Sequence, residues 1–133
     1  MKATELMIGD YVTVTPSGML IQVAATHKRK VAYHTCTNKL SWVRQGLLRP
    51  ILLTTEILEK NGVKPFLVGR YILPLENKEI FMCITPIVGL INTNGTWLAA
   101  IENGYTNAKI TINYVHELQH TFRLCQIKKE IEL

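Results

Sequence analysis

Residues 9–25 read GDYVTVTPSGMLIQVAA, and this stretch sets the expected fold of the first half of the chain. Two apolar and β-branched runs, residues 11–14 and residues 19–25, flank the turn-forming segment 16–18. Runs of this type on either side of a turn that contains Pro and Gly predict antiparallel strands. A Gly-Asp pair directly before the first run is typical of SH3-like barrels, by analogy between folds.

The same pattern continues as far as residue 53. Further strands are expected at residues 31–36, 40–43 and 47–53, and Pro50 favours an edge position for the last of them. Short strands at spacings of roughly 8–12 residues indicate a small barrel or a strongly bent sheet. We therefore predict an SH3-like small β-barrel lobe over residues 1–53.

The second half of the chain combines helices with strands. A short helix is expected at residues 56–60, where Thr54 or Thr55 can cap its free amides and Asn61-Gly62 ends it. Strands and turns follow, with strands expected at residues 66–73, 79–85, 96–101 and 109–112 and turns at 92–95 and 103–104. The strand spacing predicts a mostly antiparallel sheet.

The C-terminal segment predicts an amphipathic helix. Its apolar stripe consists of Val115, Leu118, Phe122 and Cys125, which recur at helical spacing. After Gln126 the pattern alternates with a period of two, which predicts a closing edge strand over residues 127–133. The fold class is therefore α+β, with the second lobe over residues 54–133, or with both lobes fused into one domain.

Composition limits the class of protein. The chain has 133 residues, 47% of them apolar, which is enough for one sizeable core and too apolar for a disordered chain. No apolar run approaches the roughly 18 residues of a membrane span. Glu5 and Gly9-Asp10 interrupt any signal-peptide core. We expect a cytoplasmic protein with no membrane partner, whose Cys36, Cys83 and Cys125 are reduced and buried.

The net charge of +5 is concentrated in the first lobe, where seven basic residues face two acidic ones. Such asymmetry favours an acidic partner, and we expect the contacts to come from Lys28, Arg29, Lys30, Lys39, Arg44 and Arg49. Aromatic rings for base stacking could come from Tyr11, Tyr33, His34 and Trp42. The alternative is a solvated hairpin tip, with Tyr11, Tyr33 and Trp42 in the core or half-buried.

His116-Glu117-Leu118-Gln119-His120 matches the H-E-x-x-H pattern of zinc hydrolases, in which two histidines one turn apart hold the metal and Glu polarises its water. Three features argue against a zinc site with Glu117 as the catalytic residue. No His or Asp follows His120 as a third ligand, and the motif is expected by chance in about one chain of this composition in a hundred. Both histidines also lie nearly opposite the apolar stripe, where we expect an exposed face. No cofactor is expected.

Three stretches of the chain, residues 1–12, 48–62 and 114–119, together resemble a family of small proteins from gut bacteria of the Bacteroides group and from their phages and mobile elements. The resemblance implies a biological setting and no activity. Thr55 stands where such sequences often have a helix-starting Pro, and Gln126 where some have a helix-ending Gly. Relatives often have a residue other than His at the position of His120, which would leave one zinc ligand instead of two.

These features together favour a non-enzymatic binding module of phage or mobile-element type that contacts nucleic acid or a protein partner. The alternative from another class is a zinc-dependent hydrolase that uses His116, Glu117 and His120. A further alternative is a protein-only interaction subunit or homo-oligomer that pairs through exposed strand edges.

Overall fold

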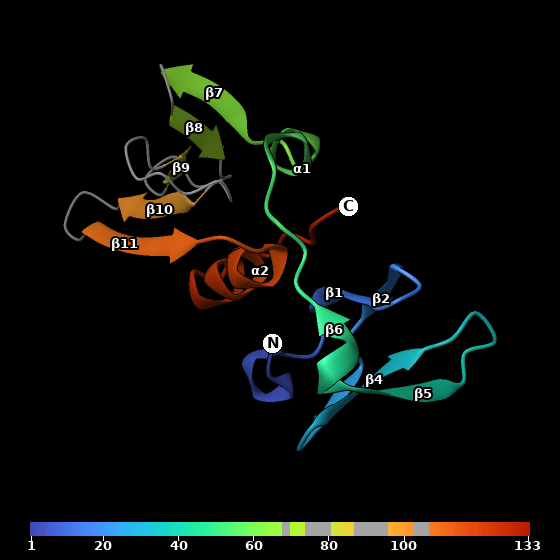
Figure 1. Ribbon diagram of the computed structural model, residues 1–133. Coiled ribbons are helices and arrows are strands. Elements are labelled where there is room, and N and C mark those ends of the chain that lie inside the picture. The colour runs from blue at the N-terminus through green and yellow to red at the C-terminus, as the bar shows by residue number, and fades with distance from the viewer. Residues whose placement is uncertain (68–69, 74–80, 87–95, 103–106) are drawn as a thin grey trace. The chain divides into compact units, whose positions relative to one another are not determined.

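A computed structural model describes residues 1–67, 70–73, 81–86, 96–102 and 107–133 (Figure 1). The chain divides into two compact units, which are described separately below. The first contains residues 1–51 and 114–129, and the second contains residues 52–113 and 130–133. The first boundary lies close to the expected one at residue 53. The C-terminal helix, which we expected in the second lobe, belongs to the first unit.

Two three-stranded antiparallel sheets form the β-structure of the first unit. In one, β1 (Tyr11–Val14) lies between β2 (Met19–Gln22) and β6 (Leu48–Arg49). In the other, β4 (Lys30–His34) lies between β3 (Ala25–His27) and β5 (Leu40–Arg44). Two short 3-10 helices, η1 (Ala3–Glu5) and η2 (Gln45–Leu47), complete this part of the unit.

The single strand expected at residues 19–25 is two strands, β2 and β3. The Val23 backbone N–H donates to the Asp10 carbonyl (2.8 Å), beside the first sheet, whereas the next N–H, of Ala24, donates to the Ala32 carbonyl (2.8 Å) in the second. The run therefore changes sheets between these two residues. The described pairings give a mixed α+β fold with small antiparallel sheets and no closed barrel.

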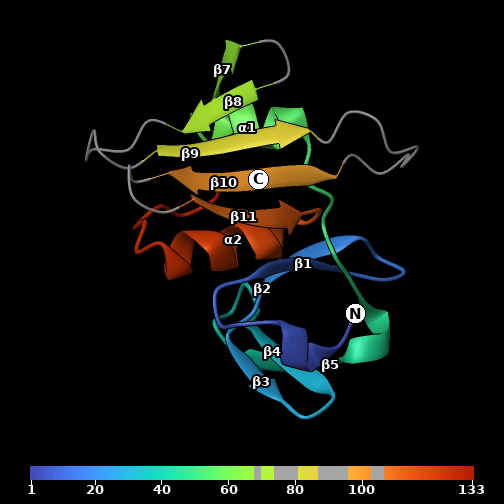
Figure 2. The same cartoon turned by 90° about the vertical axis from the view of Figure 1, so that its left-hand side faces the viewer.

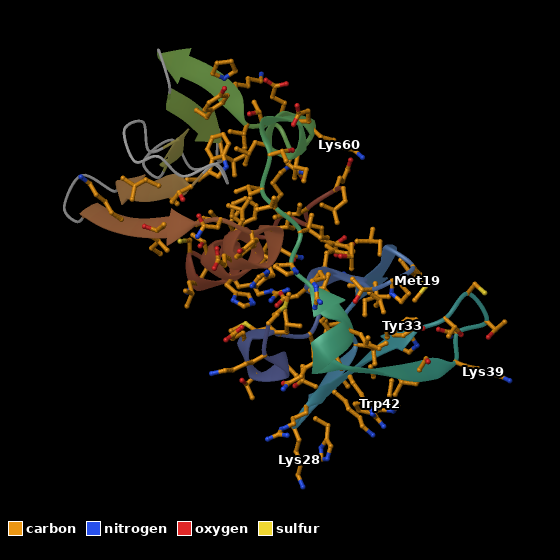
Figure 3. The ribbon with its side chains drawn as sticks, in the orientation of Figure 1. Met19, Lys28, Tyr33, Lys39, Trp42 and Lys60 are labelled. Atoms are coloured by element: carbon orange, nitrogen blue, oxygen red, sulfur yellow. The ribbon has the colours of Figure 1, made fainter. Side chains whose placement is uncertain are left out.

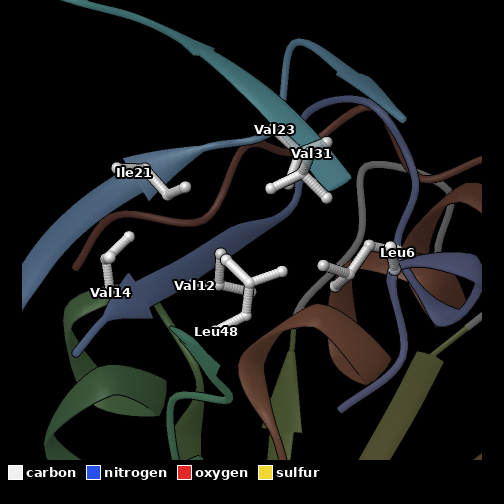
Figure 4. Packing of buried hydrophobic residues seen from close by; sticks show 8 residues of the cluster. Leu6, Val12, Val14, Ile21, Val23, Val31 and Leu48 are labelled. Carbon is white, nitrogen blue, oxygen red and sulfur yellow. The ribbon is translucent and has the colours of Figure 1, made fainter. Parts of the chain in front are cut away.

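The core of the first unit lies between its two sheets (Figure 4). Each sheet contributes side chains from one face, as the alternating burial of β1 illustrates. The fully or almost fully buried members are Ala3, Leu6, Val12, Val14, Ile21, Val23, Val31 and Leu48. Burying a Val, Leu or Ile side chain contributes about 1.5–3 kcal/mol to stability. A shift of one residue would turn these side chains outward, so the cluster fixes the register of the short strands.

Helix α2 (Val115–Leu124) is buried on more than its apolar stripe. Val115, Leu118 and Phe122 are buried as predicted, but so is His116, and His120 is only partly accessible. The prediction that both histidines lie on an exposed face is therefore wrong. A hydrogen bond to Asp10 holds His120 against the rest of the unit, and the His116 ring stacks on Tyr114.

The second unit begins with α1 (Thr55–Lys60), whose cap is Thr54, one of the two residues that the sequence offers. The hydroxyl of Thr54 accepts a hydrogen bond from the Ile57 N–H (3.4 Å), and Gly62 adopts a left-handed φ of 80° after the helix. A residue without Cβ takes this conformation at no steric cost, which is why Gly62 ends the turn.

A five-stranded antiparallel sheet forms the rest of the second unit (Figure 2). Its strands lie in the order β11-β10-β9-β8-β7, with the bounds β7 Lys64–Leu67, β8 Arg70–Leu73, β9 Phe81–Pro86, β10 Trp97–Glu102 and β11 Asn107–Ile112. The single strand expected at residues 66–73 is the antiparallel pair β7–β8. The turns expected at 92–95 and 103–104 lie outside the described residues.

No strand forms at residues 127–133, so the predicted closing edge strand is wrong. The backbone there pairs with a side chain instead. The Asn61 carboxamide donates to the Glu132 carbonyl (2.8 Å) and accepts from the Glu132 N–H (2.8 Å), as a neighbouring strand would. Ile131, next to this pair, is buried. The alternating pattern therefore does not form a strand; it contains one buried residue, Ile131, next to the backbone that Asn61 holds.

The cysteines differ in part from expectation. Cys36 is exposed, contrary to the prediction that it is buried. Cys125 is partly buried, and its burial raises the pKa of the thiol. For Cys83 the structure describes the backbone and not the side chain. None of the helices that the structure describes has the length and apolar character needed to cross a membrane.

Candidate functional site

The outer face of the β3–β4–β5 sheet carries an aromatic and basic surface. Residues paired directly across antiparallel strands share a face, and Val31 pairs with Val43 on the face that covers the core. The opposite face holds the pairs Lys30–Arg44, Ala32–Trp42 and His27–Lys30. We call this surface the Trp42 face and define it as His27, Lys30, His34, Leu40, Trp42 and Arg44.

Trp42 is unusually accessible for its size. Its side chain is 48% exposed, as is that of Leu40 on the same face. In β5 the more apolar set of alternate residues, Leu40 and Trp42, therefore faces outward, while Ser41 and Val43 face inward. Large apolar groups held in water by the register of a sheet are typical of binding surfaces.

A second ring stands beside Trp42. The His27 ring is perpendicular to it, with an interplanar angle of 81° and 6.5 Å between the ring centroids. An open hollow of about 430 Å³ lies next to both rings and is lined by Thr26, His27, Lys30 and Trp42. The hollow thus combines two aromatic walls with one cation.

The cations of the Trp42 face are not neutralised within the described part of the chain. Lys30 and Arg44 are exposed and directly opposite each other, and neither forms an ion pair with a described residue. The only carboxylates of the first 53 residues belong to Glu5 and Asp10, and Asp10 is fully buried. Like charges opposite each other destabilise a sheet, so this pair favours an anionic ligand over a structural role.

The six basic residues predicted as a binding set separate into two groups. Lys28 and Arg29 form the turn between His27 and Lys30 and are exposed, so they adjoin the Trp42 face. Lys39 directly precedes β5 and so lies at the end of the strand away from Arg44, as Figure 3 shows. Arg49 belongs to the other sheet, and its guanidinium donates to the carbonyls of Gly46 (3.0 Å) and Leu48 (2.9 Å). The structure therefore brings together Lys28, Arg29, Lys30 and Arg44.

The predicted aromatic rings separate in the same way. Trp42 and the exposed His34 lie on the Trp42 face. Tyr33 packs against the core on the other side of the sheet. Tyr11 is partly buried in β1, where its backbone N–H bonds to helix α2. One half-exposed tryptophan is therefore the main stacking surface.

The H-E-x-x-H residues have other partners. The Glu117 carboxylate accepts a hydrogen bond from the Tyr114 N–H (3.1 Å) at the start of α2. Nε2 of His120 lies 2.7 Å from Oδ2 of Asp10, and the His116 ring stacks on Tyr114 with its centroid 5.8 Å away. Within the described ranges, no three His, Cys, Asp or Glu side chains are placed to hold a metal ion.

A buried polar network around Asp10 is the feature that the sequence did not reveal. Asp10 is fully buried, and its two oxygens accept from the Met7 N–H (2.7 Å), the Arg123 guanidinium (2.7 Å) and the His120 ring. The Gln119 carboxamide accepts from the Tyr11 N–H (3.0 Å) and donates to the Gly9 carbonyl (3.0 Å). The one signal of this network in the sequence is the spacing of residues 119, 120 and 123, which places them on the same helix face.

The His116 ring predicts a pH dependence of stability. Burial is the main cause that lowers its pKa below the usual 6.5, helped by the nearby His120 and opposed by Glu117, Asp10 and Glu5. Nδ1 of His116 is buried without a hydrogen-bond partner. Between the lowered pKa and 6.5 the folded chain binds fewer protons at this site than the unfolded chain does, so the free energy of unfolding falls as pH falls through that window.

We expect His116→Phe, which keeps a ring against Tyr114, to lose less stability than the wild type between about pH 8 and about pH 5. Urea denaturation at each pH measures this difference. Parallel curves for the two proteins would contradict it.

Comparison with protein-family models, curated protein sequences and solved structures found no match to this chain.

Proposed function

We propose that this chain is a non-enzymatic nucleic-acid-binding module and that the Trp42 face is its contact surface. The observation that carries the proposal is the half-exposed Trp42 beside the unneutralised Lys30–Arg44 pair. Proteins bind nucleic acid by neutralising phosphates with Lys and Arg and by stacking bases on aromatic rings, and both groups are present on one sheet face.

The setting we propose for this module is the family of phage and mobile-element proteins that the three sequence blocks resemble. We further infer that the first unit is an SH3-like lobe whose two sheets do not close into a barrel. Its strand order supports this, because β2 and β3 are two halves of one bent run that belong to different sheets, and the 3-10 helix η2 precedes the last strand β6. In such an arrangement the β3–β4–β5 face is free to receive a ligand.

The proposal is tested by the salt dependence of binding to a mixed DNA and RNA pool. We expect the double variant Lys30→Glu/Arg44→Glu to bind at least about tenfold more weakly than the wild type. Each lost phosphate contact should reduce the log–log salt slope by about 0.7 on single strands or about 0.9 on duplex DNA. Fluorescence anisotropy across a series of salt concentrations measures both quantities.

The matched control is Lys128→Glu/Lys129→Glu. It changes the net charge by the same amount at two exposed residues that lie outside the Trp42 face. We expect this variant to keep most of the wild-type salt slope. Equal losses in both variants would show a diffuse charge effect and contradict the assignment to the Trp42 face. No binding by the wild type at low salt would overturn the function, and self-association that survives high salt would then favour a protein-only interaction subunit.

A further inference from the structure

We propose that the hollow beside Trp42 receives one unstacked base, so that the Trp42 face selects single-stranded over duplex nucleic acid. This inference rests on the proposed nucleic-acid-binding function. It goes further because charge alone attracts both strand forms, and duplex DNA, with its higher charge density, at least as strongly.

The accessibility of the Trp42 ring favours a base whose face is free. Among the side chains that the structure describes, Trp42 is the one Trp, Tyr or Phe that is exposed. Stacking on it requires a base whose face is free. Bases inside a duplex present their edges in the grooves and keep their faces against neighbouring base pairs, whereas bases of a single strand can turn outward.

The two rings beside the hollow form a corner that fits one base. Because the His27 and Trp42 rings are nearly perpendicular, a base that lies flat on Trp42 presents its edge to His27. Thr26 also lines the hollow, although its pairing with Val31 places its side chain on the core-facing side of the sheet. Every base has a face that can stack on Trp42, so we expect the site to tolerate different sequences.

The cations lie where a single strand can reach them together with the hollow. Lys30 lines the hollow itself, and Arg44 lies directly across from it on the neighbouring strand. A flexible single strand can therefore place a base in the hollow and an adjoining phosphate on these cations at the same time. A duplex can reach the cations but cannot also fill the hollow without flipping out a base.

The experiment compares three ligands that share one backbone: a single-stranded DNA 12-mer, the duplex of the same sequence, and the same strand made abasic throughout. We expect the wild type to prefer the single strand over the duplex at fixed salt. Loss of the bases should weaken binding by about 5- to 150-fold, the range that stacking of one base provides. In Trp42→Ala the two affinity ratios, single strand over duplex and single strand over abasic strand, should both fall toward one. The salt slope should persist.

Two further variants make the test specific. Trp42→Phe keeps a stacking ring and should recover part of the preference for bases. Leu20→Ala removes an equally exposed apolar side chain, 49% exposed in β2, and should behave as wild type. Equal affinity for the single strand and the duplex, or for the abasic strand, would overturn this inference alone, because salt-dependent binding would still support the proposed function. No binding to any ligand would overturn both.

Discussion

Replacing Asp10 with alanine is expected to lower the free energy of unfolding by about 3 kcal/mol. Asp10 is fully buried and is the shared acceptor of Met7, His120 and Arg123. Removing one partner of a buried ion pair costs about 3–5 kcal/mol, because the remaining groups stay buried without compensation. The lower end applies here, since the Arg123 side chain is 37% exposed and can turn to water.

Urea denaturation followed by far-UV circular dichroism measures this effect. Glu5→Ala is the matched control, because it removes an exposed carboxylate that accepts its one described hydrogen bond from the backbone N–H of Lys2. We expect that control to remain within about 0.5 kcal/mol of the wild type. A double-mutant cycle between Asp10→Ala and Arg123→Ala then isolates the coupling of this pair from the hydrogen bond to Met7. An Asp10→Ala protein as stable as the control would refute the structural role of the network.

In the second unit, Trp97→Ala is expected to lower the free energy of unfolding by about 3–5 kcal/mol, the usual effect of truncating a buried tryptophan. Trp97 is only 5% exposed, and its ring packs edge-on against Tyr71 with 5.7 Å between the centroids. Its indole N–H also donates to the Leu53 carbonyl (2.9 Å). The substitution therefore removes a large packed ring and leaves a buried acceptor unpaired.

Trp97→Phe separates these two contributions. It keeps most of the ring but not the donor, so we expect a loss of about 1–3 kcal/mol from the unpaired Leu53 carbonyl. Trp42→Ala serves as the control in the same denaturation experiment, because a half-exposed tryptophan contributes far less to stability than a buried one. Similar losses for Trp97→Ala and Trp42→Ala would mean that Trp42 is buried in solution, which would also remove the basis of the proposed binding surface.

The sequence predicted the candidate site in part. The concentration of basic residues and the hairpin turn at Lys28 and Arg29 are local features, so they could be read directly. The orientation of Trp42 could not. The sequence left Trp42 open as a stacking ring or as a core residue, and its outward position follows from the pairing of Val43 with the buried Val31 on β4. A strand pairs as a whole, so one buried contact decides the face of every residue in it.

By itself the sequence determined the elements that depend on neighbouring residues. The turn before β2, the Thr54 cap and Gly62 stop of α1, and the apolar stripe of α2 all result from local backbone preferences and side-chain periodicity. Only the tertiary structure decided that the polar side of α2 is buried too, because the partner of Gln119, His120 and Arg123 is a segment 108 to 113 residues away. Whether a polar helix face meets water or a buried carboxylate depends on what packs against it, and that partner is chosen by the whole fold.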